Sequence, residues 1–365
     1  MINFKSFDLR KIGPVFHKIP ERLGVHLEKG TARIVHLKEN GIGGYKLASH
    51  GEVAFNLAGS TSAEQRSFQE EFDRIGGGVK NLAVNIEHPS LRIRKMVLPD
   101  MPENDMLEAI RWNFREQIGV PMERYSVGYV PLSIETEQGK ISTVAYGVAQ
   151  DAIDEYLTTF RGMGLKVVSL EPAASALLAS FYINGVLNDD SIQVCIALGE
   201  TLTNFVVMRS NEMLFSRPLA AISLSSLKSH FMGNVSVDKD GASQLASKFI
   251  VGGGAISDAP NMDEEAFRKS QITFDKFFSD FVLEIKRSID AFCILYGIDR
   301  VGILHICGGR FTHPNLISSI EDSIKVKCKV YDPFYAITEK GNGTEALIDF
   351  AAQYAVAVGL AVPQE

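Results

Sequence analysis

The chain has 365 residues, which is enough for about two domains of ordinary size. Its apolar content of 45% and charged content of 22% are typical of a globular protein and exclude a disordered or fibrous chain. The 37 basic and 44 acidic residues give a net charge of −7, so the chain has no general electrostatic attraction to nucleic acid. Four cysteines without a C-x-x-C pair exclude a disulfide scaffold and predict no zinc or redox motif.

The N-terminal residues differ in charge from the rest. Residues 1–22 hold five basic and two acidic side chains, hence +3. We interpret residues 1–21 as a basic arm that contacts a membrane surface or a partner, or alternatively as a frayed or packed terminus. No apolar stretch reaches the 18 or more residues that span a bilayer, and no signal peptide is evident. The sequence therefore predicts a cytoplasmic protein.

Strands and helices alternate in the first part of the chain. Strands are predicted at residues 23–27 and 32–37, on either side of a turn at 28–30, and a third at 45–55. A helix at 62–75 is ended by three glycines, and a short apolar strand follows at 82–86. Residues 91–170 then form a helix-strand-strand-helix-strand module, whose first helix is predicted at 102–119 and last strand at 166–170.

The pattern of the start returns after residue 190. Strands at 191–198 and 204–208 surround a turn at 199–203, and a third strand at 213–218 completes a meander. Residues 233–275 show no regular pattern, and a long helix is predicted at 274–296. A buried strand at 301–306 leads into Gly308-Gly309, and a helix at 346–360 closes the chain. The repeated strand-turn-strand start predicts two similar halves with a cleft between them.

Several short runs resemble known sequences. The run ICGGRFTHPNL at 306–316 resembles the adenosine loop of actin-like ATPases. The runs VLPDMPE at 97–103, EAIRWNF at 108–114 and QIGVPME at 117–123 resemble the PilM family of type IV pilus assembly proteins. Shorter matches are EPAASA at 171–176, FSR at 215–217, YDPF at 331–334 and AVGLA at 357–361. The resemblance covers about residues 22–362.

This resemblance implies an α/β protein with the actin-like fold, in which two similar halves surround a cleft. Residues 22–90 and 171–190 would form the first half, closed by a helix at 346–362, and residues 191–345 the second. Residues 91–170 would be an inserted α+β subdomain of the kind found in FtsA and PilM. In the family, a nucleotide lies between the halves, held by backbone N–H groups of two hairpin turns and by acidic residues that organise Mg²⁺.

The sequence departs from the family at this nucleotide site. His26 and Ala197 stand where the family has aspartates, and Glu28 replaces a glycine that allows close approach to phosphate. The Glu28 carboxylate would repel phosphates, and Lys29 could offset part of its charge. The residues left for a residual nucleotide cleft are Lys29, Gly30, Thr31, Gly199, Thr201, Asn204, Gly308, Gly309 and Arg310. We therefore predict no catalytic residue, no metal site and no required cofactor, with weak ATP binding left open.

The resemblance also implies a peptide partner. PilM proteins bind the N-terminal cytoplasmic tail of the membrane protein PilN in a groove between the first half and the inserted subdomain. For this chain we expect that groove at Val84, Ile86, Ile93, Met96, Val97, Tyr125, Val127 and Tyr129. An extended peptide could there add backbone hydrogen bonds to a strand edge.

Two functions stay open from the sequence. The first is a non-catalytic scaffold of a type IV pilus platform, peripheral to the inner membrane, which binds a PilN-like tail and other platform or motor proteins but not nucleic acid. The second is an active actin-like ATPase that drives pilus or type II secretion assembly. The missing aspartates at positions 26 and 197 favour the scaffold.

Overall fold

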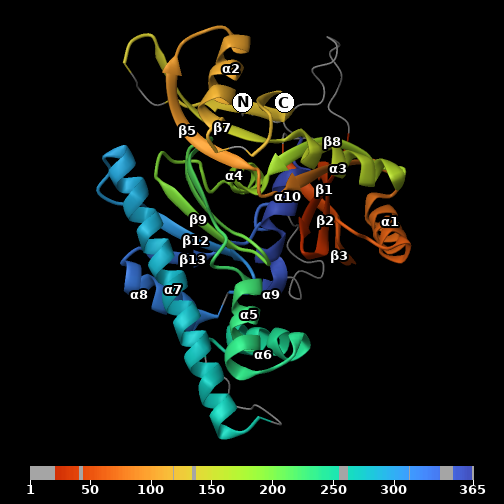
Figure 1. The fold of residues 1–365 in the computed structure, drawn as a ribbon, viewed down its shortest axis with the longest axis vertical. Coiled ribbons are helices and arrows are strands. Elements are labelled where there is room, and N and C mark those ends of the chain that lie inside the picture. The colour runs from red at the N-terminus through yellow and green to blue at the C-terminus, as the bar shows by residue number, and fades with distance from the viewer. Residues whose placement is uncertain are drawn as a thin grey trace.

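A computed structural model describes residues 21–40, 44–117, 119–133, 137–254, 262–311, 313–337 and 348–363, without the side chains of residues 348 and 349. Apart from Glu21, the predicted basic arm at residues 1–21 lies outside the described residues. The described chain forms three sheets: in the view of Figure 1 the first and second lie side by side, and the third lies above them.

The first sheet has the strand order β3-β2-β1-β4-β8. Its strands are β1 (Leu23–Glu28), β2 (Gly30–Glu39), β3 (Tyr45–Phe55), β4 (Asn81–Ile86) and β8 (Lys166–Pro172). Helices α1 (Ser62–Gly76) and α3 (Gln150–Gly162) cover one face through Phe68, Phe72 and Phe160, which are fully buried. Helices α4 (Ala173–Ile183) and α10 (Ala355–Ala361) cover the other face, so the sheet is buried on both sides.

The second sheet repeats this plan in the order β11-β10-β9-β12-β13. Its strands are β9 (Gln193–Leu198), β10 (Thr203–Arg209), β11 (Glu212–Leu219), β12 (Ile303–Gly308) and β13 (Lys327–Val330). In each sheet a three-stranded antiparallel meander is extended by two parallel strands. Helices α7 (Glu264–Tyr296) and α8 (Pro314–Ile324) pack on one face, and α4 reaches the other. The repeat predicted from the two strand-turn-strand starts is thus present in the fold.

The third sheet is antiparallel, in the order β5-β7-β6. It contains β5 (Arg92–Pro99), β6 (Tyr125–Pro131) and β7 (Lys140–Ala149), with a 3-10 turn at Met122–Arg124, and it packs on α2 (Glu103–Phe114). The structure differs from the expected module at its end. Strand β8 belongs to the first sheet, because it pairs in parallel with β4. Helix α3 packs on the same sheet. Helix α2 also ends earlier than expected, after Phe114.

Residues 233–275 are more regular than the sequence pattern indicates. Helices α5 (Leu224–Val235) and α6 (Lys239–Val251) pack together beside the lower half of α7 (Figure 1). Helix α7 begins at Glu264, ten residues before the expected start, because Asp263 accepts a hydrogen bond from the Ala266 amide at 2.7 Å and caps it. The expected closing helix consists of α9 (Ile348–Ala351), a 3-10 turn (Ala352–Tyr354) and α10.

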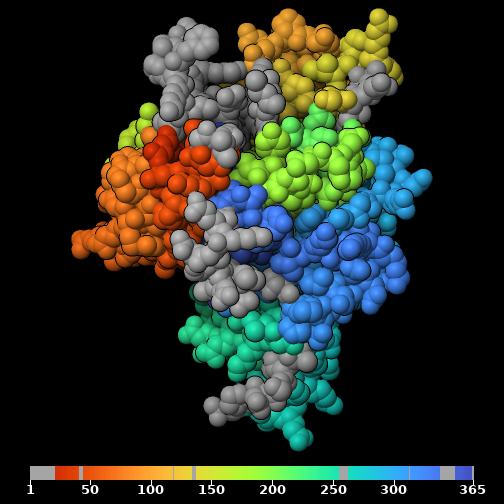
Figure 2. Space-filling view, turned by 180° about the vertical axis from the view of Figure 1, so that it is seen from behind, coloured from red at the N-terminus to blue at the C-terminus, as the bar shows by residue number. Residues whose placement is uncertain are grey.

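Two glycines allow α10 to lie unusually close to its neighbours. A Cβ atom at Gly359 would lie 1.7 Å from the Ala176 carbonyl oxygen of α4, and one at Gly24 would lie 2.0 Å from the Ala357 carbonyl oxygen. The C-terminal helix is therefore held against both α4 and β1 by backbone contact. In the view of Figure 2 these C-terminal residues, in dark blue, lie between the first-sheet residues in red and the second-sheet residues in lighter blue. No described helix is long and apolar enough to cross a membrane.

The first prediction concerns this contact. Gly359→Ala is expected to lower the free energy of unfolding by about 2 kcal/mol or more, because backbone atoms cannot yield as a flexible side chain can. Urea denaturation followed by circular dichroism measures the change. Gly233→Ala in α5 is the matched control: its Cβ would meet open space, so the helix should gain about 0.5–1 kcal/mol. Equal stability of the Gly359→Ala variant and the wild type would contradict the packing argument.

Candidate functional site

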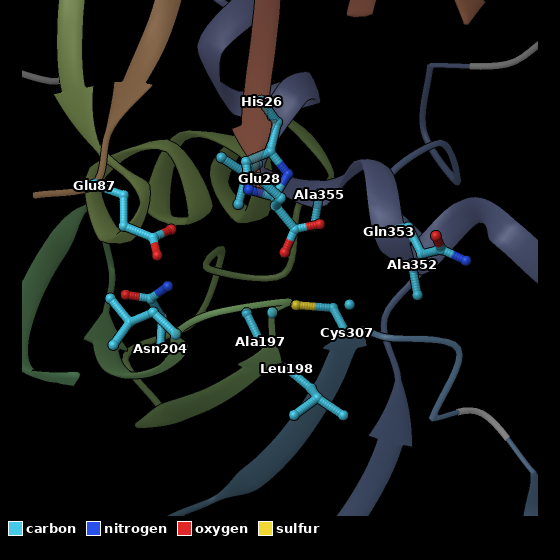
Figure 3. A pocket seen from close by; sticks show the side chains of 14 residues that line it. His26, Glu28, Glu87, Ala197, Leu198, Asn204, Cys307, Ala352, Gln353 and Ala355 are labelled. Carbon is cyan, nitrogen blue, oxygen red and sulfur yellow. The ribbon is translucent and has the colours of Figure 1, made fainter. Parts of the chain in front are cut away.

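Two hairpin turns, one from each of the first two sheets, face each other across a cleft (Figure 3). The β1–β2 turn supplies His26 and Glu28, and the β9–β10 turn supplies Ala197 and Gly199. The ladder between β1 and β4 ends at Val25; beyond it the side chain of Asn85 takes over, accepting from the Leu27 amide at 2.6 Å and donating to its carbonyl at 3.0 Å. This side-chain bridge fixes the end of β1 that carries Glu28.

The Glu28 carboxylate joins the two halves. Its Oε1 atom accepts a hydrogen bond from the backbone N–H of Glu200 at 2.8 Å, and its Oε2 atom forms an ion pair with Arg33. Arg33 also lies 2.8 Å from the Glu52 carboxylate and donates to the Gln353 amide oxygen at 3.0 Å. Backbone amides of such turns are the groups that hold phosphate in nucleotide-binding relatives of this fold. In this chain, a side-chain carboxylate occupies one of them.

A second carboxylate crosses the same cleft. Glu87 follows β4, and its Oε1 atom accepts a hydrogen bond from the Thr201 hydroxyl of the β9–β10 turn. The Glu87 amide donates to the Tyr156 hydroxyl at 3.2 Å, which ties this residue to α3. On the other side of the turn, Lys228 of α5 lies 2.8 Å from both oxygens of Glu200. The β9–β10 turn is therefore held from both sides.

The two cleft carboxylates have opposite pKa shifts. Burial by itself would raise the pKa of Glu28, but the nearby His26 and Arg33 and the hydrogen bonds from Glu200 and Arg33 outweigh it and leave that pKa below its ordinary value. Burial lowers the pKa of His26 to about 4, so His26 acts on the pKa of Glu28 only in the acid range, where it is protonated. At pH 7 His26 is neutral, and the positive charge beside the Glu28 carboxylate is that of Arg33. Burial raises the pKa of Glu87, and the negative Glu28 adds to the effect.

The space between the turns is small. The cavity lined by Glu28, Glu87, Ala197 and Asn204 has a volume of about 20 Å³, which holds little more than a single water molecule. A triphosphate with Mg²⁺ does not fit there unless Glu28 moves, and the facing carboxylates of Glu28 and Glu87 would repel its phosphates. A larger cavity of about 190 Å³ continues beside it, lined by Lys29, Lys228, Arg310 and residues of α6. The cleft is therefore nearly filled between the two turns and open beside them.

The structure gathers the residues predicted for a nucleotide cleft. Gly199, Asn204 and Gly308 line the small cavity, while Lys29, Thr31, Gly309 and Arg310 line the large one. Gly30 lies at the β1–β2 turn with a φ of 88°, and Thr201 is engaged with Glu87. Gly308 has a φ of 75°, and a Cβ there would lie 2.2 Å from the Leu198 carbonyl oxygen. The end of β12 can therefore lie this close to β9 only with glycine at position 308.

The charge that balances Glu28 comes from Arg33 and not from Lys29. His26 and Arg33 are directly opposite in the β1–β2 register, so Arg33 and Glu28 are diagonal neighbours on one face, while the exposed Lys29 is at the turn. The sequence analysis also missed Glu87, whose only signal is a carboxylate directly after a buried strand. Lys228 and Gln353 were missed because they reach the cleft from α5 and from the turn before α10, far away in sequence.

The residues predicted to bind a peptide do not form one groove. Val84 and Ile86 are buried in β4, which has β1 and β8 on its two edges, so a peptide cannot reach them. Met96, Tyr125 and Tyr129 are buried against α2. Ile93 and Val127 are partly buried, and Val97 is half-exposed. The strand pattern identified apolar residues, but most of them fill cores on the inner faces of the sheets.

Comparisons with known proteins agree on the fold. A family described as type IV pilus assembly protein PilM matches residues 270–365. The chain is similar to a solved structure entitled PilM-PilN type IV pilus biogenesis complex, with 20% identity over 94% of this chain and 98% of that one and a TM-score of 0.77. It is also similar to the ethanolamine utilization protein EutJ of Carboxydothermus hydrogenoformans, with 12% identity over 97% and 93% and a TM-score of 0.52. No curated protein matches.

These matches confirm the resemblance to PilM and the actin-like α/β fold expected from the sequence. The family match covers the C-terminal end of the chain, from within α7 onward, whereas the structural match covers nearly all of it. The short runs that carried the resemblance at 97–123 lie outside the family match. The fold is therefore the stronger of the two findings.

The second prediction uses the opposite pKa shifts of the two carboxylates. Glu28→Gln should lower the free energy of unfolding by about 2 kcal/mol at pH 7, because Arg33 loses the less exposed of its two carboxylate partners. Since the folded pKa of Glu28 is lowered, its contribution is complete above the ordinary glutamate pKa of 4.5 and is lost as pH falls through the folded pKa. The loss in Glu28→Gln should thus be constant from pH 6 to 8 and shrink below pH 4.5.

Glu87→Gln is the matched variant, for which the change in the free energy of unfolding is expected to have the opposite sign. Its folded pKa is raised, so the wild type is stabilised by this group only below 4.5 and loses that stability as pH rises through the folded pKa. Glu87→Gln should equal the wild type at low pH and exceed its stability by about 1 kcal/mol at pH 8. Urea titrations from pH 4 to 8 measure both. Parallel pH profiles for the two variants would show that the assigned environments are wrong.

Proposed function

We propose that this protein is a non-catalytic scaffold of a type IV pilus inner-membrane assembly platform, which binds the cytoplasmic N-terminal peptide of a PilN-like membrane protein. Two observations support the pilus assignment: the PilM family match at residues 270–365 and the similarity of nearly the whole chain to the structure of a PilM-PilN complex. We further propose that the protein acts on the cytoplasmic side of the inner membrane as a peripheral component, beside other platform or motor proteins.

The observation that carries the non-catalytic part is the hydrogen bond from the Glu200 amide to the Glu28 carboxylate. In an active actin-like ATPase, the two hairpin turns meet through the nucleotide phosphates and Mg²⁺. Here a permanent side-chain anion connects the turns, and Glu87 with Thr201 makes a second connection. The halves are then held together without a ligand, which suits a rigid scaffold. No carboxylate stands at positions 26 and 197 to hold Mg²⁺.

An ATPase that drives pilus or type II secretion assembly is the second candidate. The open cavity of about 190 Å³ favours it, because Gly309 and Arg310 of the expected adenosine loop line this cavity together with Lys29 and Lys228. A nucleoside could enter there while the phosphate end stays closed. The scaffold is the better supported function because binding of a triphosphate requires Glu28 to leave the Glu200 amide.

The proposed tail site lies between the first half and the inserted sheet. The Tyr125 hydroxyl lies 2.8 Å from the Ser90 carbonyl oxygen and 2.9 Å from the Gly147 carbonyl oxygen, so its single proton is shared between them and ties the inserted sheet to the segment that follows β4. The Ser90 hydroxyl accepts from the Ala149 amide at 3.0 Å, which fixes the same junction from the other side. These contacts set the orientation of the two walls of the proposed groove.

The third prediction tests nucleotide binding. Isothermal titration of the wild-type protein with ATP and Mg²⁺ should show no binding of micromolar affinity, and a phosphate-release assay should show no turnover. Glu28→Gly restores the glycine of the family pattern and removes the anion, so any residual ATP binding should strengthen in this variant. Glu70→Gln, on the exposed surface of α1, is the control for a loss of negative charge elsewhere. Tight Mg²⁺-dependent binding by the wild type would favour the ATPase.

The fourth prediction tests the partner. A synthetic peptide with the N-terminal cytoplasmic sequence of the PilN-like protein encoded beside this one should bind in fluorescence anisotropy, and a scrambled peptide should not. Tyr125→Phe loses the hydroxyl contacts at the junction, so it should weaken binding severalfold and also lower the unfolding midpoint. Failure of every PilN-like tail to bind would overturn the proposed function.

A further inference from the structure

A second groove lies on a different face, between the inserted sheet and the second half. It has a volume of about 500 Å³, within the range of about 300–1,000 Å³ typical of ligand-binding clefts. Residues 93–97 of β5 form one wall, residues 214–216 of β11 form another, and Leu295 at the end of α7 closes the third side. Figure 1 shows β5 above the upper end of α7. None of the cleft residues described above lines this groove.

Strand β5 offers a free edge to the groove. It is the outer strand of the third sheet, paired with β7 on one side only, and β11 is likewise the outer strand of the second sheet. Within the described part of the chain, no hydrogen bond connects the free edge of residues 93–98 to another strand. Unpaired amides and carbonyls of an edge strand are a template for another extended chain. At about 3.3 Å per residue, residues 93–97 suit a segment of about five residues.

The groove is basic as well as apolar. Arg94 is exposed, and the Lys95 ammonium lies 3.6 Å from the centroid of the Tyr296 ring. Neither side chain forms an ion pair with a carboxylate among the described residues. Burial lowers the pKa of Lys95, as expected for a cation without a nearby anion. Apolar surface surrounds the two cations, since Val97 is 50% and Leu295 53% exposed.

We propose that this groove binds an extended segment of a partner protein in which an acidic residue stands next to β-branched or other apolar residues, and that this segment adds to the edge of β5. The acidic side chain pairs with Lys95, and the apolar ones cover Val97 and Leu295. The positive charge of the groove distinguishes a partner segment from the N-terminal residues of this chain as its occupant. Residues 1–20 of this chain carry four basic and one acidic side chain, so they do not complement a basic groove. Ile93, Met96 and Val97, which the sequence analysis assigned to the tail site, line this groove. The site goes beyond the proposed function because it lies between the inserted sheet and the second half, whereas the proposed tail site lies between the first half and the inserted sheet.

The test is a selection from phage-displayed random twelve-residue peptides on the immobilised full-length protein. The selected peptides should combine Asp or Glu with Val, Ile or Leu and should bind with micromolar affinity. Leu295→Glu and Lys95→Glu should each weaken them tenfold or more. Two matched variants should stay within twofold of the wild type: Ile294→Glu, which lies beside Leu295 on α7 but outside the groove and is 83% exposed, and Arg66→Glu, which removes the same charge from α1.

Several results would overturn this proposal. They are the absence of any selected peptide, selected peptides without acidic residues, or equal binding to all four variants. Displacement of a selected peptide by the PilN-like tail would place both in one site. A wild-type dimer that Leu295→Glu converts to a monomer in light scattering would make a second copy of this chain the occupant. Because the selection needs no tail peptide, its outcome is independent of whether the tail binds between the first half and the inserted sheet.

Discussion

The hydrogen bond between the Glu28 carboxylate and the Glu200 amide determines how the two halves of this protein meet. In the actin-like plan, the two hairpin turns face each other with their backbone amides directed into the cleft, and that arrangement needs an anion. Here the anion belongs to the chain itself and is balanced by Arg33. The cost of burying a carboxylate is offset because it has both a cation and an amide donor, and the neutral His26 beside it adds no competing charge at pH 7.

The Glu28–Glu200 contact across the cleft is one of several contacts that hold the parts of the fold together. The halves share α4 as a common wall, and α10 packs by backbone contact on α4 and β1 of the first half. The inserted sheet is attached to the first half through Tyr125 and Ser90, and its β5 strand faces the second half across a separate groove. Both proposed peptide sites therefore lie at the borders of the inserted sheet, where rigid neighbours define their shape.

The sequence allowed much of the fold to be predicted, and the reasons can be seen in particular elements. The two strand-turn-strand units are predicted by apolar strands around Gly30 and Gly199, because a hairpin is a local structure. Helix α6 and the first turns of α7 were missed because their apolar spacing is interrupted by small and polar residues, and their stability comes from packing on α5. Strand β8 was assigned to the wrong sheet, since its partner β4 is about 80 residues away.

By itself, the sequence determined which charges and glycines the cleft contains: the replacement of two aspartates, the carboxylate at position 28 and the glycine pair at 308–309. Only the tertiary structure decided what these residues do. The diagonal register of one hairpin selects Arg33 over Lys29 as the partner of Glu28. The same packing buries Val84 and Ile86 and brings Glu87 to Thr201. The residue types follow from the chain, but contact between distant segments depends on how sheets and helices pack, which no local pattern encodes.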